Sequence, residues 1–174
     1  MRVGAWQFDV RKGDVPANLA AAERGLEEAV REGVDILLLP EMWPTSFLSS
    51  FGGADPVALL RPSVERSLEA VAAVGERAGA LGLTLAGSAY APGPAGALPF
   101  NRFSIWSGGR EVLRYDKTHL FTLTAEHLAF SAGDAAPRAV DLEVPGGPQP
   151  LDDEIDLAAL CGLDGEAGLG LDGH

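Results

Sequence analysis

The stretch Val34-Asp-Ile-Leu-Leu-Leu-Pro-Glu-Met-Trp43 is the part of the sequence that most clearly predicts the fold. Residues 34–39 form a mainly apolar run, which is typical of a strand covered on both faces. Pro40 ends this run, and Glu41 follows it directly. The stretch therefore predicts a central strand that holds a carboxylate rigidly at its end.

A strand and a helix are expected before this stretch. Residues 2–9 alternate in polarity and predict a first strand. Asp14 is a plausible N-cap with Pro16 in the first helical turn, and Gly33 would end the helix. The apolar residues between them recur at helical spacing: Leu19, Ala22, Leu26, Ala29 and Val30.

The residues after Trp43 predict a loop, a second helix and a series of strands. The loop over 44–62 is rich in Pro, Gly and Ser, and Ser63 would cap a helix that stops near Gly82. A Gly-Gly turn at 107–110 predicts a hairpin. The expected strands cover residues 83–89, 102–106, 111–115, 139–144 and, in a short segment, 155–160. This order predicts an α/β fold, a layered mixed β-sheet with helices on one face.

The distribution of charge divides the chain into two parts. The net charge of −12 argues against nucleic acid and anionic membrane as partners. All 13 basic residues lie at or before Arg138, whereas the last 34 residues hold nine acids and no basic residue. We expect one domain over residues 1–147 and an acidic divergent tail over 148–174.

The sequence also bears on the compartment. It has one cysteine, so no internal disulfide can form, and no apolar run approaches the ~20 residues of a membrane span. The N-terminus shows no signal-peptide pattern. These features predict a cytoplasmic protein.

A second polar stretch, Arg114-Tyr-Asp-Lys-Thr-His-Leu-Phe121, follows the strand expected at 111–115. Lys117 at such a strand end can stabilise a developing oxyanion, and Glu41 at its own strand end can act as a general base. The plainer interpretations are an ordinary surface lysine and a solvated glutamate.

Together with Gly4-Ala-Trp-Gln-Phe-Asp9, these two stretches resemble the carbon–nitrogen hydrolase (nitrilase) superfamily over residues 2–147. The resemblance implies the first half of an αββα sandwich. It implies hydrolysis of a small amide or nitrile through a Glu41–Lys117–Cys161 triad and a thioester intermediate. No metal or organic cofactor is needed for that chemistry.

The resemblance also gives roles to residues near Lys117. Glu126 matches a second glutamate that positions the lysine or the substrate, and Asn101 and Tyr115 match positions used for packing and loop hydrogen bonds. His119 and His127 could form a metal site with Glu126, but they lack a tight ligand spacing, so structural histidines are the favoured interpretation. The loops over 43–51 and 91–99 are candidates for shaping the substrate pocket.

Cys161 allows two interpretations. The apolar segment 155–160 precedes it, as expected for the nucleophile, but the residues after it differ from the family pattern. It is either a divergent nucleophile or a small apolar residue of an unrelated tail. The change in composition near Pro148 suggests a truncation or a change of reading frame. In that case the protein would be an inactive homologue, a binding or subunit-interaction module, and its exposed apolar surface would favour homo-oligomers.

Overall fold

A computed structural model describes residues 1–47 and 56–142. Five strands form one mixed sheet in the order β1-β2-β3-β4-β5. The first three strands, β1 (Val3–Ala5), β2 (Ile36–Leu38) and β3 (Thr84–Ala91), are parallel. The last two, β4 (Phe100–Ser107) and β5 (Arg110–Asp116), continue the sheet in antiparallel fashion. The hairpin between them turns at Gly108 and Gly109, both with positive φ, as the sequence predicts.

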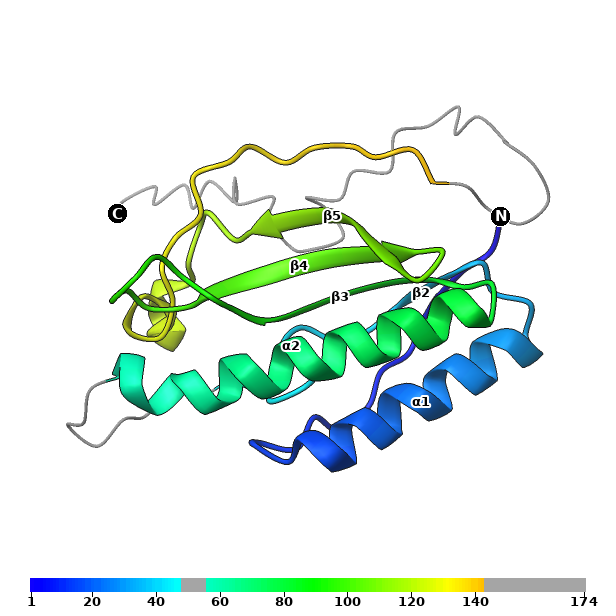
Figure 1. Ribbon diagram of the computed structural model, residues 1–174, viewed down its shortest axis with the longest axis horizontal. Coiled ribbons are helices and arrows are strands. Elements are labelled where there is room, and N and C mark those ends of the chain that lie inside the picture. Colours follow the sequence, from blue (N-terminus) through cyan, green and yellow to red (C-terminus); the bar gives the residue numbers. More distant parts are fainter. Residues whose placement is uncertain (48–55, 143–174) are drawn as a thin grey trace, which may run out of the picture.

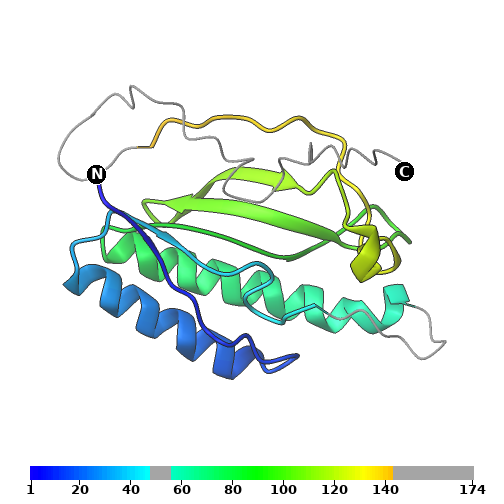
Figure 2. The same cartoon turned by 180° about the vertical axis from the view of Figure 1, so that it is seen from behind.

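Two helices cover the same face of this sheet, in agreement with the predicted fold class (Figure 1, Figure 2). The first, α1 (Val15–Arg31), is capped by Asp14, whose Oδ1 accepts a hydrogen bond of 3.2 Å from the Ala17 amide. Gly33 follows it with a φ of +64°. The second, α2 (Pro56–Ala80), packs beside α1 and against the sheet strands β3 and β4.

Tryptophan side chains fit against glycines of both helices. A Cβ atom at Gly25 of α1 would lie 2.4 Å from the Trp6 ring, and one at Gly75 of α2 would lie 2.3 Å from the Trp106 ring. Only glycine allows so close an approach, because the rings occupy the space of the missing Cβ. The aromatic side chains therefore fix how both helices lie on the sheet.

The predicted start of α2 is wrong. The helix begins at Pro56 rather than after Ser63, and Pro62 lies inside it. Leu60 explains the difference, because its side chain is 1% exposed and belongs to a core cluster with Met42, Tyr90 and Phe130. Burial of the Leu60 side chain outweighs the local signal of Pro62.

The strand expected at 139–144 is also not formed over its described part, residues 139–142. That segment crosses the sheet face opposite the helices (Figure 1). There Val140 and Leu142 pack against Ala86, Ile105 and Leu113 without joining the sheet. The strand expected at 155–160 and the whole acidic tail lie outside the described residues, so the predicted division at residue 147 stays a prediction. Within the described ranges, no helix is long and apolar enough to span a membrane.

Candidate active site

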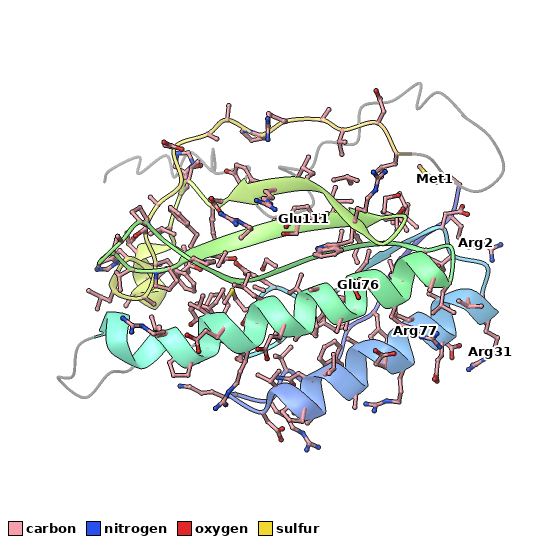
Figure 3. The ribbon with its side chains drawn as sticks, viewed as in Figure 1. Met1, Arg2, Arg31, Glu76, Arg77 and Glu111 are labelled. Atoms are coloured by element: carbon pink, nitrogen blue, oxygen red, sulfur yellow. The ribbon has the colours of Figure 1, made fainter. Side chains whose placement is uncertain are left out.

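Three of the four predicted site residues meet at one end of the sheet. Glu41 follows β2, Lys117 follows β5, and Glu126 lies in the short 3-10 helix η2 (Glu126–Leu128). Because β2 and β5 run in the same direction, their carboxyl ends share one edge. Arg2, Arg31 and Arg77 lie toward the opposite end, near the N-terminus (Figure 3). Cys161, the fourth predicted residue, lies outside the described residues.

Lys117 is held between the two carboxylates. Its Nζ donates to Glu41 Oε1 and to Glu126 Oε1, each at 3.1 Å. The lysine side chain is only 17% exposed. Burial acts to lower the pKa of Lys117, but the charge of Glu41 and the hydrogen bonds to both carboxylates outweigh it, so the pKa lies above its ordinary value. Lys117 is therefore a fixed cation at neutral pH.

Glu126 has both carboxylate oxygens engaged. Its side chain is 3% exposed; Oε1 accepts from Lys117 and Oε2 accepts from the Phe121 amide at 2.6 Å. Ala125, in the left-handed region with a φ of +59°, turns the chain between the 3-10 helix η1 (Thr122–Thr124) and η2. This geometry gives Glu126 the means to hold Lys117 in place.

Glu41 is the accessible carboxylate of the cluster, with 47% of its side chain exposed. The next residue, Met42, has a φ of +53° and donates its amide to Ser88 Oγ at 3.0 Å. The completely buried Met42 side chain thus fixes the turn from which Glu41 projects. An open depression adjoins Glu41 and is lined also by Pro40 and residues 7–10.

Asn101 contacts Glu41, which the sequence did not predict. Its Nδ2 donates to Glu41 Oε1 at 2.7 Å, and its carbonyl oxygen accepts from the Lys117 amide at 2.9 Å. The family resemblance marks Asn101 only for packing and loop hydrogen bonds, and β4 also holds Arg102 and Ser104, so its polarity does not single it out. Tyr115 behaves as expected, since its hydroxyl bonds to Thr118 Oγ1 at 2.9 Å and its ring packs against the sheet cluster around Ile105.

The two histidines are surface residues rather than members of this hydrogen-bonded cluster. His119 is exposed and its Nδ1 hydrogen-bonds to Thr118 Oγ1 at 3.0 Å, and His127 is exposed as well. Within residues 1–47 and 56–142, no group of three or more His, Cys, Asp or Glu side chains is arranged to hold a metal ion. The cluster instead offers one cation, one accessible carboxylate and one buried carboxylate.

The two loops expected to shape a pocket differ in what is described. The loop over 91–99 is fixed to the segment after η2, because Ser131 donates its amide to the Pro99 carbonyl and its hydroxyl to the Leu98 carbonyl, each at 2.8 Å. Of the loop over 43–51, residues 48–51 lie outside the described residues. Phe47 in its first part makes an edge-to-face contact with Phe130, with ring centroids 6.3 Å apart.

The fold and the cluster define an α/β protein whose candidate active site pairs one lysine with two carboxylates. Its sequence matches the carbon-nitrogen hydrolase family over residues 2–147, and the chain belongs to that family. The expected family and fold class are therefore confirmed.

Two sets of relatives accompany this match. The chain is similar to the omega-amidase YafV of Escherichia coli K12 and of strain B, with 34% identity over 122 residues, covering 70% of this chain and 43% of the relative. Among solved structures, it resembles an alanine-for-cysteine mutant of the Nesterenkonia AN1 amidase from the nitrilase superfamily. That match has a TM-score of 0.68 and 22% identity, and covers 80% of this chain and 51% of the other. The NitN amidase of Nesterenkonia sp. AN1 matches with a TM-score of 0.67 and 20% identity, over 83% and 54% of the two chains. The chain thus spans about half the length of the relatives that it matches.

Proposed function

We propose that the protein hydrolyses the carbon–nitrogen bond of a small amide. The observation that carries the proposal is Lys117, held at 3.1 Å from both an accessible and a buried carboxylate. Membership of the carbon-nitrogen hydrolase family and similarity to relatives named as amidases favour an amide substrate over a nitrile.

The proposed reaction uses Cys161, the only cysteine of the chain, as nucleophile. Glu41 takes the thiol proton, and the thiolate attacks the carbonyl carbon to form a tetrahedral oxyanion. Lys117 stabilises this oxyanion with its fixed charge. As the carbon–nitrogen bond breaks, Glu41 returns the proton to the nitrogen, and ammonia leaves a thioester on the sulfur.

Hydrolysis of the thioester completes the cycle. Glu41 accepts a proton from a water molecule, whose oxygen attacks the thioester carbon. Collapse of the second tetrahedral intermediate breaks the carbon–sulfur bond, and the proton held by Glu41 returns to the thiolate. The carboxylic acid leaves, and the free thiol is restored. Glu126 does not transfer a proton in this scheme, because both of its oxygens already accept hydrogen bonds.

Ammonia release from short aliphatic amides by the purified full chain tests this proposal. We expect release by the wild type and its loss in Glu41→Gln, Lys117→Met and Cys161→Ser. His127→Gln, at an exposed position with no role in the scheme, is the matched control and should keep wild-type turnover. Release that continues in Cys161→Ser would contradict the triad, and the corresponding nitriles tested alongside decide between the two substrate classes.

The second candidate function is a non-catalytic homologue that acts as a binding or subunit-interaction module. It is favoured by the residues after Cys161, where Gly162-Leu-Asp164 differs from the pattern that the family resemblance implies for a nucleophile. Absence of ammonia release, together with slow alkylation of Cys161 at neutral pH, would support it. Cytoplasmic location and homo-oligomer formation stay predictions under either candidate, and size-exclusion chromatography with light scattering tests the latter.

A further inference from the structure

Asn101 contacts both members of the pair that the proposed reaction uses. Its side chain contacts the Glu41 carboxylate at 2.7 Å, and its backbone carbonyl accepts the Lys117 amide at 2.9 Å. The residue is 2% exposed, so this amide group is withdrawn from water. A buried side-chain donor aimed at a carboxylate is a strong, charge-assisted contact.

We propose that Asn101 is a positioning residue that fixes Glu41 relative to Lys117 and leaves Glu41 Oε2 as the oxygen that accepts the proton. This inference rests on the proposed function. Glu41 Oε1 accepts from both Asn101 and Lys117. No donor from the described part of the chain reaches Oε2, so that oxygen keeps its lone pairs for proton transfer.

The exposure of Glu41 explains why a positioning residue is needed. With 47% of its side chain exposed, Glu41 has little packing to restrict its rotamers. A base that samples several positions is less often within reach of the proton it must take. The two donors on Oε1 supply the restriction that packing does not.

The surroundings of Asn101 make it a rigid anchor. Its strand is paired on both sides, with Tyr90 opposite Asn101 in β3 and Asp116 opposite the next residue, Arg102, in β5. Arg102 forms a bidentate ion pair with Asp116, in which Nε donates to Oδ1 at 2.7 Å and Nη2 donates to Oδ2 at 2.9 Å. This pair fixes the register of β4 and β5 directly before Lys117, so the spacing of Asn101 and Lys117 is fixed too.

The type of side chain matters as much as its place. Asparagine brings a neutral donor to Glu41, whereas an aspartate of nearly the same shape would bring a second negative charge. Like charges at this distance repel, so Asn101→Asp should lose the contact without losing volume.

The first test is a double-mutant cycle on unfolding, which needs no activity. We compare the unfolding equilibrium constants of Asn101→Ala, Glu41→Ala and the double variant. Each single substitution raises the unfolding equilibrium constant by some factor. If Asn101 holds Glu41, the factor for the double variant should be about fivefold smaller than the product of the two single factors. Ser104→Ala is the matched control, because Ser104 is a buried residue of the same strand whose hydroxyl donates to Glu111 Oε1 at 2.6 Å. Combined with Glu41→Ala, it should show no coupling, so the two factors should simply multiply.

The second test separates kcat from KM in amide hydrolysis. Asn101→Asp and Asn101→Ala should lower kcat by about 10- to 100-fold while KM changes by less than about threefold. Ser104→Ala should keep wild-type constants. Asn101→Ala introduces no charge, so kcat and KM can still be measured on this variant if Asn101→Asp does not fold.

The outcomes distinguish this inference from the proposed function. Coupling in the cycle together with a lowered kcat supports the inference. Absence of coupling overturns it, and so does coupling with an unchanged kcat, which would make the contact merely structural. If the wild type releases no ammonia, the proposed function fails, while the cycle still decides whether Asn101 fixes Glu41.

Discussion

Replacing Glu126 by glutamine removes the charge of the buried carboxylate and keeps its shape. Both oxygens of Glu126 accept hydrogen bonds, from Lys117 Nζ at 3.1 Å and from the Phe121 amide at 2.6 Å. Glutamine has one oxygen, so its NH₂ group must face one of these two donors. Glu126→Gln therefore breaks one of these two hydrogen bonds and turns the glutamine NH₂ group, itself a donor, toward a donor at a position that is 3% exposed.

The size of the effect follows from these contacts. A buried donor left without a partner costs about 1–3 kcal/mol. Removing one partner of a fully buried ion pair costs about 3–5 kcal/mol, but Lys117 keeps Glu41 and is partly exposed. We therefore expect Glu126→Gln to lower the free energy of unfolding by about 2 kcal/mol.

Urea unfolding followed by tryptophan fluorescence measures this loss. With a slope of about 2 kcal/mol/M, the midpoint should fall by about 1 M. Lys117→Met removes the charge that Glu126 faces, so the double variant should be more stable than the sum of the single losses implies. A midpoint within about 0.2 M of the wild type, or strictly additive losses, would refute the role given to Glu126.

Three further predictions follow from the same geometry. Burial lowers the pKa of Lys117, but the charges and hydrogen bonds of Glu41 and Glu126 raise it by more than burial lowers it. The pKa therefore lies above its ordinary value of 10.5. The stability that this charge contributes is fully present below about pH 10 and is lost as the pH rises through the raised pKa. As the pH rises from 7, the difference in unfolding free energy between wild type and Lys117→Met, measured by urea titration, should therefore stay constant up to about pH 10 and then shrink. A decline that already begins at neutral pH would contradict the ion pairs. Glu41→Gln should abolish ammonia release, yet change the free energy of unfolding by less than about 1 kcal/mol, because the side chain is half exposed. A circular dichroism spectrum of an unfolded protein would show instead that Glu41 supports the fold. Gly75→Ala should destabilise the fold by about 1–3 kcal/mol in thermal unfolding, because its Cβ would meet the Trp106 ring, and a second substitution, Trp106→Ala, should relieve that clash; no loss in Gly75→Ala would show that the helix does not pack so closely.

The sequence predicted the parts of the fold that depend on short-range patterns. Asp14 caps α1 as expected, because capping involves residues three apart. The start of α2 was misplaced, since Pro62 is a local signal whereas the burial of Leu60 depends on Met42 and Tyr90 from distant parts of the chain. Likewise, residues 139–142 have an apolar strand-like pattern but pack on the sheet face without pairing.

The candidate site was predictable to a similar extent. Glu41 and Lys117 stand out because each follows a strand, and strand ends gather at one edge of a sheet. The contact between Asn101 and Glu41 joins residues 60 positions apart and depends on the order and register of the strands. A single sequence states neither, so this contact could be found only in the structure.

The alkylation rate of Cys161 at neutral pH tests the central claim most directly, because Glu41 and Lys117 can assist a thiol only if it lies beside them. With iodoacetamide in excess, we expect Cys161 to react faster in the wild type than in Glu41→Gln or Lys117→Met, while His127→Gln matches the wild type. Equal rates in all four proteins would show that this thiol does not meet the carboxylate and the ammonium, and would contradict the proposed triad.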